Sequence, residues 1–517
     1  MKLAKKAISL VLATTLAATG LAACSKGNTE STASGSAAST GAVDTSKEVN
    51  VSMYLLGGEG KFNKDLVAKL NEKLKKDINT TLTVKYIDWP DVSTKYPLLF
   101  AAGEDFDMSY VSYGAAVPYA TLAKQGSLVD ITQMIDKVPS LKAAIPQEKW
   151  DQVKVDGKIY SVPNLYTEFI PNGFVSRDDL VKKYNLKPIK DVSTMEAYLD
   201  AVVKNEKFAP FNGNSGDAQN LYQLFLGSTG KWLDAPGIPK SDMFLVTKSA
   251  QDYKTVMHPA FTQEFEDWAV RMHDWAKKGY FPKDIISSQH GAKENFINGL
   301  SGAYITHMAD WTGSYGACLK TMPNVTTSFW CPAEDNGKIL KTSANQNSTA
   351  ISVNSKNPER ALMVINELMN DETCYDLLQY GIKGRQWDIK DGKVIQPATY
   401  NKDKDEAGFS GWSFRNDKFN IPMATEDPRR YTLNKDWAKV AIDNPYASFN
   451  FDSKNITSEL SAVANVNATL GIQLMLGKTQ DDPKKAVEQY RQQLKQAGID
   501  KIVAEVNSQL QNYTPGK

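Results

Sequence analysis

Hydrophobic and polar positions along the chain follow two periodicities, which alternate from segment to segment. Residues 48–56 alternate and are rich in β-prone side chains, which predicts a strand. Leu66, Leu70 and Leu74 recur every four residues, which predicts an amphipathic helix. Strands and helices that alternate in this way indicate a parallel sheet with right-handed crossovers. The expected strands lie at 48–56, 81–88 and 106–112, and the helices between them at 61–77 and 96–102.

A second run of elements follows in the middle of the chain. Phe261, Phe265, Trp268, Met272 and Trp275 form a stripe at spacings of four and three, which is typical of a core-facing helix rather than an aromatic binding surface. Asp-Gly pairs inside 155–158 and 388–394 predict two tight hairpins. Further strands are expected at 173–176, 302–308 and 350–354, and helices at 178–184, from 357, from 482 to 498, and after 498.

The first residues have the pattern of a secretory signal. Three lysines lie among the first six residues, and a mostly apolar run follows from 7 to 23, short for a membrane span. Its end, Leu-Ala-Ala-Cys24, resembles a bacterial lipobox, in which the Cys24 thiol is acylated; ordinary cleavage beside an incidental cysteine is the alternative. The next stretch is almost all Ser, Thr, Gly, Ala and Asn, which predicts a flexible tether. The expected bounds are 1–23 for the signal peptide and 24–46 for the tether.

Composition changes the picture in two respects. With 517 residues and 42% hydrophobic content, the chain is long enough for two sizeable cores. Its formal charge of +1 becomes about −2 when the three signal lysines are removed, so no basic field for nucleic acid is expected. Apart from Cys24, the cysteines are Cys318, Cys331 and Cys374. The sequence leaves open whether Cys318 and Cys331 form a disulfide or all three are buried thiols.

Five short motifs carry a resemblance to a known family. They are Leu98–Asp107, Asp156–Pro163, Val175–Leu180, Ser301–Thr306 with Trp311, and Ser355–Ala361. Their content and order resemble the family 1 extracellular solute-binding proteins, the maltose-binding-like group. The stretch from 445 to 513, through Asn465–Asn467 and Ala497–Lys501, resembles the extra domain of a LipO-like lipoprotein subfamily.

The resemblance implies an α/β chain with the two-lobed type II periplasmic-binding fold, hinge strands and added C-terminal helices. It also implies a lipid-anchored receptor on the extracytoplasmic face of the cell membrane, which delivers a sugar or oligosaccharide to the permease subunits of an ABC transporter. We expect a monomer. The expected bounds are 47–163 and 343–385 for the first lobe, 164–342 and 386–444 for the second lobe, and 445–517 for a C-terminal helical extension packed on the second lobe.

A sugar-binding site needs flat aromatic rings for the C–H faces of the ligand and polar side chains for its hydroxyls. In open α/β sheets, ligands bind at the carboxyl ends of the strands, so residues that follow the expected strands are the natural candidates. Trp311 is the first choice, because the family resemblance includes a stacking tryptophan there. The candidates are Trp311, Trp89, Tyr113, Trp387, Arg385, Trp412, Tyr166, Glu59, Asp88, Asp310, Arg415 and Asn416.

Other chemistries find less support. The glycines at 57–60 lack the last glycine of a phosphate-binding fingerprint, and Asp403 with Asp405 lacks the remaining ligands of a calcium loop. We therefore expect no cofactor, no metal and no catalysis. The alternatives to a sugar receptor are a receptor for another polar solute such as a peptide, a surface enzyme acting on glycans, and a module that presents its ligand to a sensor kinase.

Overall fold

A computed structural model describes residues 42–514, apart from 113–118, 236–244 and 481. The predicted signal peptide, most of the tether, Cys24 and Tyr113 lie outside the described residues. Among the helices described, none combines the length and the apolar character that a membrane span requires.

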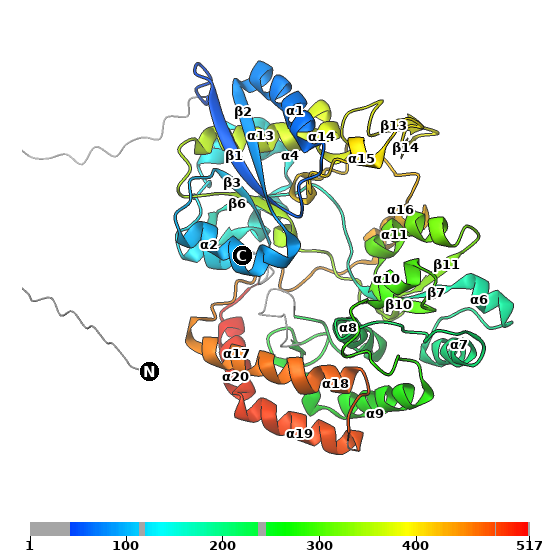
Figure 1. Ribbon diagram of the computed structural model, residues 1–517. Helices are drawn as coiled ribbons and strands as arrows, with labels where there is room; N and C mark the ends of the chain where they lie inside the picture. The colour runs from blue at the N-terminus through cyan, green and yellow to red at the C-terminus, as the bar shows by residue number, and fades with distance from the viewer. Residues whose placement is uncertain (1–41, 113–118, 236–244, 481, 515–517) are drawn as a thin grey trace, which may run out of the picture. The chain divides into compact units, whose positions relative to one another are not determined.

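The first sheet has five strands in the order β2-β1-β3-β12-β6 (Figure 1). β1 pairs in parallel with β2 from Val49 opposite Thr80 onward, and also in parallel with β3. β12 runs antiparallel to both β3 and β6. Parallel pairing at β1, β2 and β3 matches the predicted alternation of strand and helix. The strands are β1 (Val49–Leu56), β2 (Thr80–Ile87), β3 (Met108–Val111), β6 (Ser161–Pro163) and β12 (Ser348–Ile351).

Helices cover this sheet through a common hydrophobic cluster. Leu66, Leu70 and Leu74 on α1 are at most 1% exposed, so the predicted stripe faces the core. Burying each of these side chains stabilises the fold by roughly 1.5–3 kcal/mol. The predicted strand at 350–354 begins and ends earlier, because the chain turns after Ile351. The helices are α1 (Asn63–Ile78), α2 (Val92–Ala101), α3 (Tyr119–Lys124), α4 (Pro139–Ala144), α5 (Gln147–Gln152), α13 (Pro358–Asn370) and α14 (Glu372–Gln379).

The first described residues are fastened to this sheet by one buried arginine. Arg360, at the start of α13, is 5% exposed. Its guanidinium donates to the Asp44 carbonyl at 2.7 Å and to Thr80 Oγ1 at 3.0 Å, and also to the carbonyl of Ile78. The segment before β1 is therefore held at the end of the sheet where β1 and β2 begin.

The second sheet has three strands in the order β10-β7-β11, both outer strands antiparallel to β7. The predicted stripe on α9 is buried, with Trp275 1% exposed. Phe261 is an exception: it is 38% exposed, because α9 begins only at Gln263, after Thr262 caps it. The elements are β7 (Asn172–Arg177), β10 (Ala303–His307), β11 (Thr327–Trp330), α6 (Asp178–Lys183), α7 (Val192–Asn205), α8 (Asp217–Thr229), α9 (Gln263–Lys278), α10 (Ala292–Ile297), α11 (Met308–Thr321), α12 (Pro332–Asp335) and α16 (Arg429–Val440).

Both predicted Asp-Gly hairpins are confirmed. Asp156 and Gly157 have φ of +50° and +80°, and Asp391 and Gly392 have φ of +52° and +72°. Two consecutive left-handed residues are what the preferred two-residue hairpin turn requires. The hairpin strands are β4 (Lys154–Val155) with β5 (Lys158–Ile159) and β13 (Asp388–Lys390) with β14 (Lys393–Ile395); a further pair is β8 (Val246–Thr247) with β9 (Val256–Met257), and the short helix α15 (Lys402–Asp405) follows β14.

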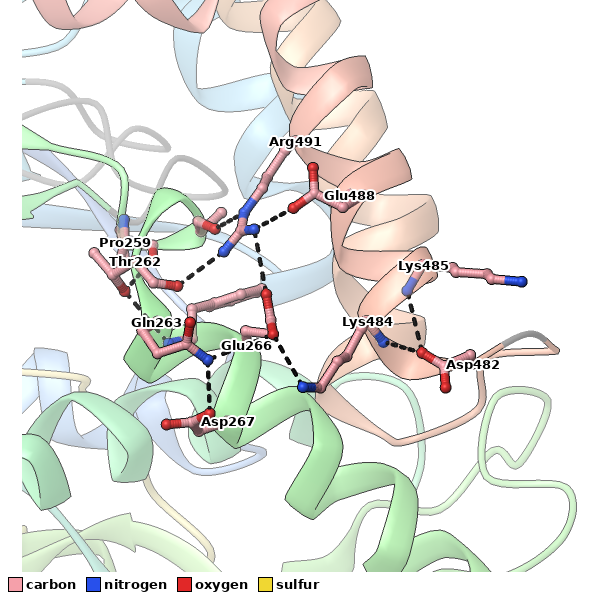
Figure 2. A network of polar contacts seen from close by, with 12 residues as sticks. Pro259, Thr262, Gln263, Glu266, Asp267, Asp482, Lys484, Lys485, Glu488 and Arg491 are labelled. Carbon is pink, nitrogen blue, oxygen red and sulfur yellow. Dashed lines mark hydrogen bonds and ion pairs between the residues drawn. The ribbon is translucent and has the colours of Figure 1, made fainter.

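The C-terminal helices pack on α9, and Figure 1 shows α19 beside it. Val487, Tyr490 and Leu494 belong to the same hydrophobic cluster as the α9 stripe. A polar network of α19 with α9 and the residues before it borders this contact and centres on Arg491 (Figure 2). The helices are α17 (Thr457–Val466), α18 (Ile472–Met475), α19 (Pro483–Gln496) and α20 (Ile499–Gln511), with a π-helical turn at Asn467–Gly471 between the first two.

Three segments cross between the two sheets, at 164–171, 331–347 and 411–428. Two of them touch where they leave the first sheet: Leu165 bridges to Asn416, and the Asn164 side chain donates to the Trp412 carbonyl at 3.0 Å. Three crossings of this kind provide a hinge between two α/β bodies.

Candidate ligand-binding site

Three aromatic rings gather at the carboxyl ends of the first-sheet strands. Trp89 follows β2 directly, and its side chain is 57% exposed. Its ring centroid lies 5.5 Å from that of Trp412, which lies 6.4 Å from that of Tyr110 on β3. We call Trp89, Trp412 and Tyr110 the aromatic platform. An exposed indole held in place by its neighbours offers a flat apolar face to a ligand.

The backbone beside the platform requires glycine. Gly57, directly after β1, has φ of +104°, and a Cβ there would lie 3.4 Å from Trp89 Nε1. Gly58 and Glu59 follow, exposed, and a Cβ on Gly58 would lie 3.1 Å from Asp88 Oδ1. The exposed carboxylate of Asp88 therefore borders the platform and provides hydrogen-bond acceptors, and Glu59 adds a second exposed carboxylate in the turn after β1.

A compact group of charges lies in the crossing segments. Arg415 Nη2 is 3.2 Å from Glu168 Oε2, and the guanidinium lies 4.2 Å from the centre of the Tyr166 ring. Arg430 Nη2 donates to the Tyr166 hydroxyl at 2.6 Å and pairs with Glu426. Burial raises the pKa of Tyr166, so this phenol stays neutral. Each guanidinium is thus matched by a carboxylate.

A pocket of about 430 Å³ lies against the second sheet. Its wall includes three carboxamides from one face of α8, whose opposite face is buried in the core. Trp232 adds an aromatic surface that is itself 7% exposed. The lining side chains used below are Gln219, Asn220, Gln223, Trp232, Asp234, His307, Lys338, Lys341 and Gln346.

Two buried polar atoms of pocket-lining residues have no partner among the described residues: His307 Nδ1 and Gln346 Oε1. His307 ends β10, and burial lowers the pKa of its imidazole, which is therefore neutral at pH 7 and donates or accepts at Nδ1 according to its tautomer. Buried polar atoms are nearly always hydrogen-bonded in folded proteins. Gln346 Oε1 is thus suited to a ligand that donates a hydrogen bond.

Gln346 connects the platform with the pocket wall. The Tyr110 hydroxyl lies 2.8 Å from Asn347 Oδ1 and 3.2 Å from the Gln346 carbonyl, while Gln346 itself lines the pocket.

The structure brings together some of the predicted site residues. Trp89, Trp412 and Asp88 lie at or beside the platform, and Glu59 is exposed in the turn after β1. Tyr166 and Arg415 lie in the neighbouring charged group, although Tyr166 is only 8% exposed. Asn416 is 5% exposed and donates to the Met369 carbonyl at 3.0 Å, which gives it a structural role.

Four others lie elsewhere. Trp311 was expected in a loop but lies inside α11, 2% exposed, with Nε1 donating to Thr327 Oγ1 at 2.9 Å. Trp387 is 3% exposed and donates to the Gly381 carbonyl. Arg385 pairs with Asp405 at 2.8 Å, and Asp310 pairs with Lys293. Ligand contact by these residues stays a prediction, and they are not part of the site built here.

Sequence reasoning missed Tyr110, His307, Gln346 and the α8 carboxamides. Tyr110 and His307 occupy predicted strands, where a side chain is usually assigned to packing. The polar face of α8 has the same pattern as a solvent-facing surface. The one signal in the sequence was the residue types on that face, where amide side chains occupy positions that Lys and Glu usually occupy on a solvent-facing helix.

Two α/β bodies joined by three crossings, with a pocket and exposed rings beside the hinge, define a two-lobed solute-binding protein. Residues 66–384 match the model of a family described as bacterial extracellular solute-binding protein, and the chain belongs to that family. Residues 445–515 match a separate domain of unknown function. The predicted family and its extracellular setting are confirmed; the LipO-like subfamily stays a prediction.

Similar proteins extend over nearly the whole chain. A carbohydrate ABC transporter substrate-binding protein of Streptococcus pneumoniae is 24% identical, over 97% of this chain and 96% of that protein. The crystal structure of the N-glycan transport solute-binding protein NgtS from S. pneumoniae superposes with a TM-score of 0.73 at 20% identity, covering 90% of this chain and 99% of that one. The alginate-binding protein AlgQ2 gives 0.62 at 18%, with the same coverages. The predicted two-lobed fold is confirmed.

Proposed function

We propose that this protein is the substrate-binding receptor of an ABC importer and captures a sugar or oligosaccharide by closure of its two lobes. The single observation that supports a sugar is the aromatic platform, an exposed indole and its ring neighbours beside acceptors at the hinge. The relatives described as carbohydrate-binding support the same assignment. Binding without catalysis is part of the proposal.

The proposed mechanism is closure around the crossing segments. Trp89 and Tyr110 of the platform belong to the lobe proposed at 47–163 and 343–385. Trp412 falls within the bounds proposed for the other lobe, 164–342 and 386–444, but packs against the hydrophobic cluster of the first sheet. Most of the pocket belongs to the lobe proposed at 164–342 and 386–444. A ligand that contacts both lobes stabilises the closed arrangement by its differential affinity for that state. A lipid anchor at Cys24 and a tether at 24–46 would keep the receptor at the extracytoplasmic face of the membrane.

Isothermal titration of the purified protein with a panel of oligosaccharides and peptides tests this proposal. We expect an oligosaccharide to bind, and Trp89→Ala to weaken binding about 10- to 100-fold, which corresponds to ~1.4–2.7 kcal/mol. The melting temperature should change little, because the Trp89 side chain is 57% exposed.

Phe261→Ala provides the matched control, since Phe261 is also an exposed ring, 38% accessible, but lies before α9. Its affinity should equal that of the wild type. Binding of peptides alone would replace the sugar proposal with the peptide alternative. Release of shortened products from a bound oligosaccharide would indicate an enzyme.

A further inference from the structure

We propose that this site selects uncharged oligosaccharides and rejects acidic ones, and that the carboxamide wall of α8 is the main selector. The inference rests on the proposed function and names its substrate class.

The wall has the chemistry of a surface made for hydroxyl groups. Gln219, Asn220 and Gln223 lie at i, i+1 and i+4 on α8, so they share one face of the helix. None of the three side chains makes a hydrogen bond to another described residue, and all three line the pocket. A carboxamide both donates and accepts, as a hydroxyl does, and it has no charge to attract an anion.

The two lysines of the pocket wall are matched in number by two carboxylates, although an ion pair is described for only one of the lysines. Lys341 lies 2.7 Å from Asp443, whereas Lys338 shares the pocket wall with Asp234 and has no ion pair among the described residues. At the hinge, Arg415 is paired with Glu168, and both side chains are at most 16% exposed. Acidic-sugar sites rely on unpaired guanidinium or ammonium groups, because these form the strong charge-assisted bonds to carboxylates.

Carboxylates near the platform add electrostatic repulsion of acidic ligands. Asp88 is an exposed carboxylate directly before Trp89, and Glu59 is a second exposed carboxylate, in the turn after β1. Like charges at close range repel each other, and more strongly where water is partly excluded and the effective dielectric constant falls. A sugar ring with a carboxylate stacked on Trp89 would meet this repulsion, whereas the same ring with a hydroxymethyl group would donate hydrogen bonds to these acceptors.

An acceptor in the pocket wall points to the same preference. Gln346 Oε1 accepts hydrogen bonds, and hydroxyls supply donors that an ionised carboxylate lacks. A ligand that contacts both the platform and the pocket is longer than one sugar unit, with one end stacked on Trp89 and the other end bound by amides.

Matched ligand pairs test the inference on the purified full chain. β-1,4-mannotetraose and the β-1,4-linked mannuronate tetrasaccharide differ only in a hydroxymethyl against a carboxylate on each ring, and cellotetraose with its glucuronate counterpart forms a second pair. Calorimetry at low and at physiological salt should give at least tenfold tighter binding of the neutral member. Equal or tighter binding of the acidic members refutes the inference while the sugar-receptor function stands. Failure of all four to bind refutes both.

Two variants test whether the α8 carboxamides cause the preference for uncharged ligands. Gln223→Lys places a cation on the wall and should narrow the neutral-to-acidic ratio at least tenfold, more strongly at low salt. Gln489→Lys makes the same change on the exposed face of α19 and should leave the ratio as in the wild type. If Gln223→Lys melts like the wild type but leaves the ratio of neutral to acidic affinity unchanged, α8 does not determine this preference.

Discussion

Arg491 is predicted to fasten the C-terminal helices to the second lobe. The side chain extends from α19 and is 17% exposed (Figure 2). Its Nε donates to the Ala260 carbonyl at 2.6 Å and its Nη2 donates to the Thr262 carbonyl at 2.9 Å. The remaining nitrogen lies 3.4 Å from Glu266 Oε2 and also contacts Glu488.

The magnitude follows from these contacts. A hydrogen bond from a charged group contributes about 1.5–3 kcal/mol, and the lower end of that range suits a side chain that solvent still reaches. Two such bonds to backbone carbonyls give a loss of about 3 kcal/mol for Arg491→Ala. Arg491→Lys keeps the charge but not the planar fork, so it should lose about half as much.

Urea unfolding followed by tryptophan fluorescence measures this loss, because Trp268 and Trp275 lie on α9 under the same contact. Lys484→Ala is the matched control: Lys484 faces the same Glu266 at 3.6 Å, but its side chain is 64% exposed. An exposed pair of this kind contributes less than about 1 kcal/mol. A loss below about 0.5 kcal/mol for Arg491→Ala, or an equal loss for Lys484→Ala, would refute the reasoning.

Two further outcomes are expected. Burial lowers the pKa of His258 to about 3 from its ordinary 6.5, so the folded state keeps its full stability above pH 6.5 and loses about 1.4 kcal/mol per pH unit as the pH falls towards 3. The variant His258→Asn keeps an acceptor for the Ala260 N–H, so its free energy of unfolding should lack this dependence on pH. Parallel plots of unfolding free energy against pH for the variant and the wild type would contradict this. Cys318, Cys331 and Cys374 are free, buried thiols, and burial raises the pKa of the first two to about 11 and about 12. All three should resist a thiol reagent at pH 8 until the protein unfolds; recovery of one thiol after unfolding would indicate a disulfide between the first two.

The architecture was predictable because it depends on periodicity. The spacing of Leu66, Leu70 and Leu74 specifies which face of α1 is buried, and the two Asp-Gly pairs specify their turns whatever surrounds them. Phe261 shows the limit of periodicity, since the stripe continues through it although the helix does not.

The site was predictable only where chain position determines exposure. Trp89 follows a strand of the parallel sheet, and there the expectation of an exposed ring was met. Trp311 also follows a strand, but the helix α11 begins first and turns the indole towards Thr327. Gln346 becomes part of a site only because a crossing segment brings it next to Tyr110. The residues around either position do not predict this long-range contact.

The Arg360 contacts determine at which end of the first sheet the described chain begins. They hold Asp44 where β1 and β2 begin, while Trp89 lies where β2 ends; eight residues of strand separate the two by roughly 26 Å. The start of the described chain therefore lies at the opposite end of β2 from Trp89. Force applied to residues 42–48 would act first on the Arg360 hydrogen bonds and not on the carboxyl ends of the strands.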